Sequence, residues 1–392
     1  MTNILEKIDS FVCKYKTIIL IILLFPCFRT DAPKYFGIFY EIIFDYLVWP
    51  FAFIVIIDYF LIKKIKPSKL MCAFLLYQAW LVVDQLRIRW LTLYDYSFIA
   101  RGIILGLLIE INVKGDFKKL IKAFLIIFEC LIYINTITIV INLFNGTQHY
   151  ADNFLGYYNN IIVFVYPAIC VASLYIYSTK KWIRGCFLIF VSIVSVFLSL
   201  AATPRGALIA SIAVFIFEFL LYKINKKEFV KLWPLVVIAL LFNVFIVVIY
   251  REGLFPLLDN FIINILHRST NFTGRSEIWD KAIELAKEAS LFGFGYTPEI
   301  QIGSFVAAHA HNELLAMWIR YGLVGVGLYA VFSFIYIREI DRQNCSIIKI
   351  IFISLVFGIF LGFIADRMSR AYLYYIIFFF AYHFKTISEN KE

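Results

Sequence analysis

Long apolar segments follow one another along almost the whole chain, and they limit its fold more than any other feature. A helix needs about 20 mostly apolar residues to cross the hydrocarbon core of a bilayer. These runs are too long and too evenly apolar for the strands of a membrane β-barrel, which leaves helices as the spanning element. The sequence therefore predicts an all-α, polytopic integral membrane protein with about 12 transmembrane helices. The expected spans are 15–28, 37–62, 70–84, 97–113, 123–144, 161–178, 186–203, 207–222, 235–250, 312–337, 347–365 and 371–384.

The composition excludes a soluble protein. Hydrophobic residues make up 62% and charged residues only 16% of the 392 residues, which leaves too few polar groups for a water-exposed surface. We expect a single transmembrane domain over residues 1–392. The long polar stretch 251–310 is then one large loop within that domain, and the residues suited to chemistry gather in it and beside it.

Lysine and arginine residues predict the orientation, because basic residues accumulate in the loops on the cytoplasmic side. If the N-terminus is cytoplasmic, most of the 37 basic residues fall at the two termini and in alternate short loops, such as 63–69, 114–122 and 180–184. Both termini are therefore expected in the cytoplasm, and the 251–310 loop is expected to be extracytoplasmic. The net charge of +10 comes from these basic loops, so we assign it to contacts with anionic lipid headgroups and not to nucleic-acid binding.

The extracytoplasmic loop is expected to contain a short amphipathic helix. Ile278, Trp279 and Ala282 recur at helical spacing with charged residues between them, and Ser276 fits the N-cap position. Arg275 stands just ahead of this helix, where a cation is unfavourable for the helix dipole. A phosphate ligand would explain it, because guanidinium binds phosphate through two hydrogen bonds; the alternative is an ordinary solvated arginine.

Arg205 is the second arginine of interest. It lies in the sequence Ala-Thr-Pro-Arg-Gly-Ala, which we expect to be a very short outward turn between two spans, fixed by Pro204 and Gly206. A guanidinium so close to lipid is costly unless it meets an anion. Arg205 is therefore a candidate ligand of a lipid-linked phosphate at the membrane boundary, and the alternative is an arginine that reaches up to the headgroups.

Two histidines stand where the loop re-enters the membrane, in Ala-His-Ala-His-Asn-Glu. On a helix, His309 and His311 would point to different sides, and Glu313 completes no metal-binding motif, so we expect no metal site. An imidazole at the water boundary is suited to act as a general base. We predict this role for His311, with His309 and Asn312 beside it as substrate-binding residues; a capping or headgroup-contacting histidine is the alternative.

The sequence also contains two glycine motifs and several charges in or near the expected spans. Gly293 and Gly295 in Phe-Gly-Phe-Gly predict a tight turn, although close approach to a phosphate is an alternative. Gly322, Gly325 and Gly327 within one expected span favour close helix packing. Some charges lie in or beside the expected spans and could serve a function, but structural pairing with arginines such as Arg101 or Arg320 explains them at least as well. They are Glu41, Asp45, Asp84, Arg87 and Arg89.

Together, these motifs resemble one known group of membrane enzymes. Gly274-Arg275-x3-Trp279, Phe292-Gly-Phe-Gly and His309-Ala-His-Asn followed by Gly322-x2-Gly325 are similar to the motifs of the O-antigen ligase and Wzy-type polymerase superfamily. Arg205 resembles the arginine that precedes this region in the same group. The resemblance covers residues 190–335 by motif, and it implies a GT-C-like glycosyltransferase that needs neither a metal nor another cofactor.

The resemblance implies that a glycan moves from a polyprenyl-pyrophosphate carrier to an acceptor hydroxyl, with inversion, on the extracytoplasmic face. His311 would act as the base, and Arg205 and Arg275 would stabilise the leaving pyrophosphate. We expect a polymerase of O-antigen, capsule or exopolysaccharide repeat units, whose donor and acceptor are both carrier-linked. The first alternative is an O-antigen ligase that transfers the glycan to lipid A core or another acceptor.

A lipid-linked oligosaccharide transporter or flippase is the alternative from another class, although the sequence shows neither a repeat nor the paired broken helices typical of transporters. A purely structural membrane component would leave Arg205 and His311 without a role. The expected location is the bacterial cytoplasmic (inner) membrane. Membrane lipids surround the protein there, and a chain-length regulator and a flippase of the same pathway are candidate partners.

Overall fold

The computed structural model describes residues 14–30, 37–88, 93–146, 153–200, 202–225, 231–250, 255–256, 260, 264, 275–296, 298–302, 305–307, 309–344, 346–364 and 370–389. Nearly all of these residues are helical. After the helical residues 14–24, the elements in chain order, with η for 3₁₀- and π-helices, are η1 (Phe25–Cys27), α2 (Ile38–Glu41), η3 (Ile42–Tyr46), α3 (Val48–Ile57), η4 (Asp58–Ile62), α4 (Lys69–Ile88), α5 (Leu93–Asn112), α6 (Phe117–Phe144), η5 (Tyr158–Asn160), α7 (Ile161–Thr179), α8 (Trp182–Leu198), α9 (Ala202–Asn225), α10 (Leu232–Val244), η6 (Phe245–Ile249), α12 (Arg275–Ala289), β1 (Ile300–Ile302), β2 (Phe305–Ala307), α13 (Glu313–Arg342), α14 (Ile347–Gly362), η7 (Ala371–Tyr374), α15 (Tyr375–Tyr382) and α16 (Phe384–Glu389).

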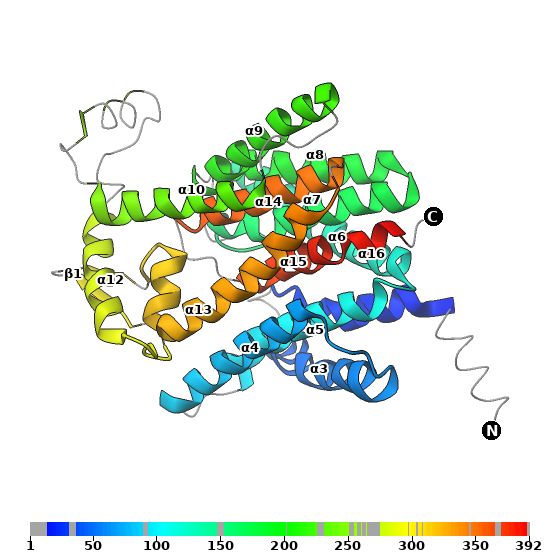
Figure 1. The fold of residues 1–392 in the computed structure, drawn as a ribbon, viewed down its shortest axis with the longest axis horizontal. Helices are drawn as coiled ribbons and strands as arrows, with labels where there is room; N and C mark the ends of the chain where they lie inside the picture. Colours follow the sequence, from blue (N-terminus) through cyan, green and yellow to red (C-terminus); the bar gives the residue numbers. More distant parts are fainter. Residues whose placement is uncertain are drawn as a thin grey trace.

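The all-α membrane fold predicted from the apolar runs is confirmed. A helix occupies each of the 12 expected spans within the described residues, and seven of these helices are long and apolar enough to cross a bilayer. The shorter apolar helices are α8, α14 and the η7–α15 segment. The helical residues 14–24 and α16 lie at one end of the long axis of the molecule, whereas α12 and β1 lie at the other (Figure 1). We call the latter the α12 end.

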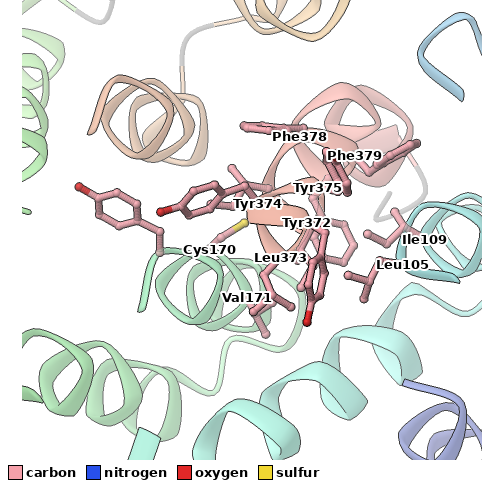
Figure 2. Packing of buried hydrophobic residues seen from close by; sticks show 14 of the residues in the cluster. Leu105, Ile109, Cys170, Val171, Tyr372, Leu373, Tyr374, Tyr375, Phe378 and Phe379 are labelled. Carbon is pink, nitrogen blue, oxygen red and sulfur yellow. The ribbon is translucent and has the colours of Figure 1, made fainter. Parts of the chain in front are cut away.

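Helix α7 forms the centre of the bundle. In its most apolar stretch 83% of the residues are buried, compared with 22% for the span in α9. This difference indicates that α7 packs against protein on all sides, while α9 presents most of its apolar surface to lipid. Figure 2 shows the aromatic residues of η7 and α15, such as Tyr374 and Phe378, beside Leu105 of α5 and Cys170 of α7. Burial of these large rings holds the C-terminal helices inside the bundle.

One embedded acid is paired, as the sequence analysis proposed. Asp45 in η3 is fully buried and receives a 2.6 Å ion pair from Arg101 of α5 and a 3.1 Å ion pair from Arg29. Arg101 also donates to the backbone carbonyl oxygens of Phe44 and Pro26, at 2.7 and 3.3 Å. Because its guanidinium is satisfied by these protein groups, we assign this cluster a structural role.

The described residues from 275 to 307 of the polar loop form a separate small unit at the α12 end. Helix α12 packs against the outer part of α13, against η6 and against β1, around a second hydrophobic core that includes Trp279, Ala282 and Leu315. Strands β1 and β2 form an antiparallel hairpin in which Ile300 pairs with Ala307. The sequence did not predict this hairpin, because each strand has only three residues and three residues show no clear periodicity.

The buried pair gives a first prediction. Arg101→Met should lower the free energy of unfolding by about 3–5 kcal/mol, because Asp45 would lose its closest counterion inside the bundle. The matched control is Lys281→Met, which removes the ion pair with Glu284 on the water-exposed face of α12 and should leave the unfolding temperature unchanged. Thermal unfolding of the two variants in detergent measures the difference. Equal unfolding temperatures would contradict the structural role of Arg101.

Candidate active site

The two histidines lie side by side in an irregular turn just before α13. His311 has a left-handed backbone with φ of +46°, a conformation that costs a non-glycine residue about 1–2 kcal/mol. This turn brings the centres of the His309 and His311 rings within 4.2 Å of each other. The expectation that the two side chains would point to different sides was therefore wrong, because it assumed a helix at positions that the structure shows as a turn.

A hydrogen bond defines the state of His309. The backbone N–H of His311 donates to Nδ1 of His309 over 3.2 Å. A nitrogen that accepts a hydrogen bond carries no proton, so this contact favours the His309 tautomer that has its proton on Nε2. His311 itself is half-buried. Among the described residues, no group of three His, Cys, Asp or Glu side chains is arranged to hold a metal ion.

Asn312 fixes the position of this turn. Its side-chain oxygen accepts a 3.0 Å hydrogen bond from the backbone N–H of Leu315 and caps the N-terminus of α13. Its amide nitrogen donates to the side-chain oxygen of Asn243 in α10 at 3.1 Å and to the carbonyl of Ile364 at 3.3 Å. Asn312 is completely buried. The geometry assigns it the task of holding His311 in place, and the expected contact with substrate stays a prediction.

Arg275 begins α12. The sequence predicted Arg275 ahead of the helix with Ser276 as the cap, but Arg275 is itself helical, so Ser276 lies inside the helix. The amphipathic helix is confirmed, because Ile278, Trp279 and Ala282 are buried in the second core, while Lys281 faces water. The hydrogen bond that Lys281 donates to Glu284 raises the pKa of Lys281. Since α12 packs on β1 and on α13, Arg275 belongs to the same small unit as the two histidines.

Arg205 lies on a different helix. The expected turn around it was wrong: Pro204, Arg205 and Gly206 form the first turns of α9, where proline is tolerated because the first helical N–H groups need no partner within the helix. The guanidinium donates through Nη2 to the carbonyl oxygen of Phe197 near the end of α8. Its Nε is buried and has no hydrogen-bond partner among the described residues. Whether Arg205, Arg275 and His311 meet around one substrate stays a prediction.

The glycines of the two motifs meet each other. Helix α13 breaks at Gly322, whose φ is +68°, and the turn after α12 inserts into the break. Phe294 N–H donates to the carbonyl of Ile319 at 2.9 Å, and Gly295 N–H donates to that of Arg320 at 2.8 Å. On the other side of the break, Leu323 and Val324 donate to the carbonyls of Ser290 and Leu291, at 3.2 and 3.0 Å. The inserted turn thus replaces helical hydrogen bonds that the break removes. We call this junction the glycine splice.

The close approach of the two backbones requires glycine on both sides. A Cβ on Gly293 would lie 2.4 Å from the carbonyl oxygen of Arg320, and a Cβ on Gly322 would lie 2.2 Å from that of Leu291. The tight turn predicted at Gly293 is confirmed, since its φ is +75°. Gly322 has a structural role, but the close packing against another helix predicted for it is wrong, because Gly322 breaks α13 and packs against the loop after α12.

Two side chains of helix α4 donate hydrogen bonds to backbone carbonyls of the glycine splice. Arg87 donates to the carbonyl oxygens of Gly293 and Phe292, at 2.5 and 3.2 Å, and it pairs with the buried Asp84 at 3.1 Å. Trp80 donates from Nε1 to the carbonyl of Tyr321 at 3.0 Å. From the sequence alone, Arg87 was identified only as an embedded charge. The contact could not be foreseen, because its partners are backbone atoms about two hundred residues away along the chain.

A comparison with protein-family models identifies a family that part of the chain matches. Residues 190–330 match the model of the O-antigen ligase family. This segment contains Arg205, Arg275, both histidines and both glycines of the splice. Among curated proteins and solved structures, no match to the chain was found.

The glycine splice gives a second prediction. Gly322→Ala should lower the free energy of unfolding by at least about 2 kcal/mol, because the new Cβ meets a backbone oxygen and the positive φ becomes strained. Gly327→Ala on the same helix is the matched control, since no atom lies within 4 Å of its added Cβ. Thermal unfolding in detergent compares the two. A similar unfolding temperature for both variants would show that the helix break does not depend on Gly322.

Proposed function

Because the segment that carries these side chains belongs to the O-antigen ligase and Wzy-type polymerase superfamily, we propose that this protein is a membrane glycosyltransferase with a polyprenyl-pyrophosphate-linked glycan donor. The family match over residues 190–330 is the observation that carries this proposal. The paired histidines His309 and His311 and the Nε of Arg205, unpartnered among the described residues, support a mechanism. The site lies at the α12 end, which we propose to be extracytoplasmic, with both termini in the cytoplasm of a bacterial cell.

The proposed reaction is a single displacement. His311 removes the proton from the acceptor hydroxyl, and the resulting oxygen nucleophile attacks the anomeric carbon of the donor. The bond between that carbon and the pyrophosphate oxygen breaks, so the pyrophosphate leaves with the bonding electrons and the configuration at the carbon inverts. Arg205 and Arg275 stabilise the negative charge that grows on the leaving group. The proton stays on His311 until it is released to water.

The acceptor distinguishes two forms of this reaction. We propose a polymerase, in which the acceptor is a second carrier-linked glycan of an O-antigen, capsule or exopolysaccharide. The alternative is a ligase that transfers the glycan to lipid A core or another acceptor, in line with the name of the matching O-antigen ligase family. Purified protein with a carrier-linked repeat unit as the only glycan separates the two. Chain growth supports the polymerase, and growth only after addition of lipid A core supports the ligase.

A transporter of lipid-linked glycans makes a different prediction in the same system. In liposomes with a carrier-linked repeat unit added from outside, an enzyme lengthens the glycan, whereas a transporter moves the carrier across the bilayer without lengthening it. Movement without growth would overturn the proposed function.

The proposed role of His311 as general base gives a third prediction. His311→Ala should reduce glycan transfer by about 10²–10⁴-fold, because general base catalysis is lost. Lys281→Ala, on the exposed face of α12, should transfer glycan at the wild-type rate and serves as the control. Glycan length by gel electrophoresis, at matched expression levels, measures both. A wild-type length distribution in the His311 variant would exclude His311 as the base.

Arg205 gives a fourth prediction. Arg205→Lys should slow transfer by about tenfold or more although it keeps the charge, because an ammonium cannot make two parallel hydrogen bonds to phosphate. Arg338→Lys, at the far end of α13, is the matched control and should have no effect. Initial rates with the carrier-linked donor compare them. If the Arg205→Lys variant keeps the full rate, Arg205 serves only as a positive charge.

A further inference from the structure

Asn243, near the end of α10, carries a buried polar group whose partner the protein itself does not supply. The residue is only 4% exposed. Its side-chain oxygen accepts the 3.1 Å hydrogen bond from Asn312. Its amide nitrogen, Nδ2, is buried and has no hydrogen-bond partner among the described residues. A buried donor without an acceptor is unfavourable and rare in folded proteins, so this NH₂ group requires an explanation.

The orientation of this amide follows from its neighbour. A backbone N–H can only donate, so the atom of Asn312 that accepts the N–H of Leu315 is the side-chain oxygen. The other end of the Asn312 amide is then its NH₂ group, and the atom of Asn243 that it contacts must be an oxygen. Exchange of the oxygen and nitrogen of Asn243 would place two NH₂ groups against each other. The unpartnered end of Asn243 is therefore a donor.

This donor lies beside the histidine turn. Asn243 is bonded to Asn312, the residue that follows His311. Ile246, about one turn further along, belongs to the same hydrophobic core as Ala310, the residue before His311. The chain after α10 continues as the π-helix η6, and π-helical turns are rare and often lie at functional sites. The NH₂ group of Asn243 therefore belongs to the candidate active site.

Together, Asn243 and His311 complement a hydroxyl group. A hydroxyl has one hydrogen to donate and lone pairs that accept. The ring nitrogen of His311 that acts as the base accepts this hydrogen, and the NH₂ group of Asn243 can donate to the oxygen. A donor at the oxygen stabilises the negative charge that develops as the proton leaves. Because Nδ2 is buried, the hydroxyl has to displace the groups that cover it, and exclusion of water then strengthens the new bond.

We propose that Asn243 is a further catalytic residue, which donates a hydrogen bond to the attacking hydroxyl of the acceptor and orients it toward His311. The inference rests on the proposed function and adds the group that positions the nucleophile. The hydroxyl proton passes to His311, the oxygen attacks the anomeric carbon, and Asn243 keeps both of its amide hydrogens. A pyrophosphate oxygen of the donor also accepts hydrogen bonds, but the bond between Asn243 and the residue next to the base favours the hydroxyl.

The first test removes the donor and keeps the oxygen. Asn243→Asp retains an acceptor for the amide of Asn312, but its carboxylate has no hydrogen to give and repels the growing negative charge. The kcat of glycan transfer should fall about 10²-fold, which is typical for the loss of a donor to a developing oxyanion. The KM for the carrier-linked donor should stay unchanged. If Asn243 served only to hold Asn312, the variant would transfer glycan at the wild-type rate, and that result would overturn the proposal.

Ser192→Ala is the matched control for this test. Ser192 on α8 is also fully buried, and its hydroxyl has no hydrogen-bond partner among the described residues. The bonds that hold the histidine turn come from α10, α13 and the residue after α14, and not from α8. The control variant should therefore keep the wild-type kcat.

A second measurement does not depend on how much of a variant folds. It uses an alkyl glycoside of the repeat unit, which lacks pyrophosphate and can act only as acceptor, and the same glycoside with hydrogen in place of the attacking hydroxyl. The wild-type protein should bind the hydroxyl compound more tightly than the deoxy compound. Asn243→Ala should reduce this preference about threefold to tenfold, because one hydrogen bond to the hydroxyl is lost. An unchanged preference would overturn the proposal.

A further ligand identifies the competing partner. If Asn243→Ala weakens the binding of a polyprenyl pyrophosphate without glycan, and the preference for the hydroxyl compound is unchanged, the NH₂ group binds the leaving group and the proposal is wrong. Absence of glycan transfer by the wild-type protein to any acceptor would instead overturn the proposed function.

Discussion

The glycine splice is the interaction on which the candidate active site depends. Helix α13 has to break at Gly322, and each backbone group released there would be costly to bury without a partner. The turn after α12 provides these partners, so the break and the turn stabilise each other. As a result, α12 is held beside the outer part of α13. Arg275, at the start of α12, and His311, just before α13, are therefore both attached to the packed pair of helices.

This arrangement explains why glycines and catalytic candidates recur in the same segment. The glycines are required where two backbones touch, and the histidine turn is held by Asn312, which links α13 to α10 and to the residue after α14. Arg87 and Trp80 of α4 add contacts from the N-terminal half of the chain. Packing, and not the loop sequence alone, therefore fixes the geometry of the α12 end.

The sequence could predict the helices because membrane spans are long, apolar and locally encoded. It could also single out Asp45 as an acid that needs a buried partner. It could not predict the glycine splice, which pairs backbone groups that lie about thirty residues apart and leaves no periodic pattern. The left-handed turn at His311 was missed for a similar reason, since positive φ at a non-glycine residue depends on tertiary contacts. The first turn of α9 was read as a loop because proline and glycine usually mark turns.

The central claim is that Arg205, Arg275 and His311 act on one lipid-linked pyrophosphate. The most direct test is an electron cryo-microscopy structure of the protein in nanodiscs with a non-reactive polyprenyl-pyrophosphate glycan analogue. The account predicts pyrophosphate oxygens within hydrogen-bonding distance of both guanidinium groups, and the anomeric carbon facing His311. A pyrophosphate bound away from either arginine, or an anomeric carbon turned away from the histidine, would contradict it.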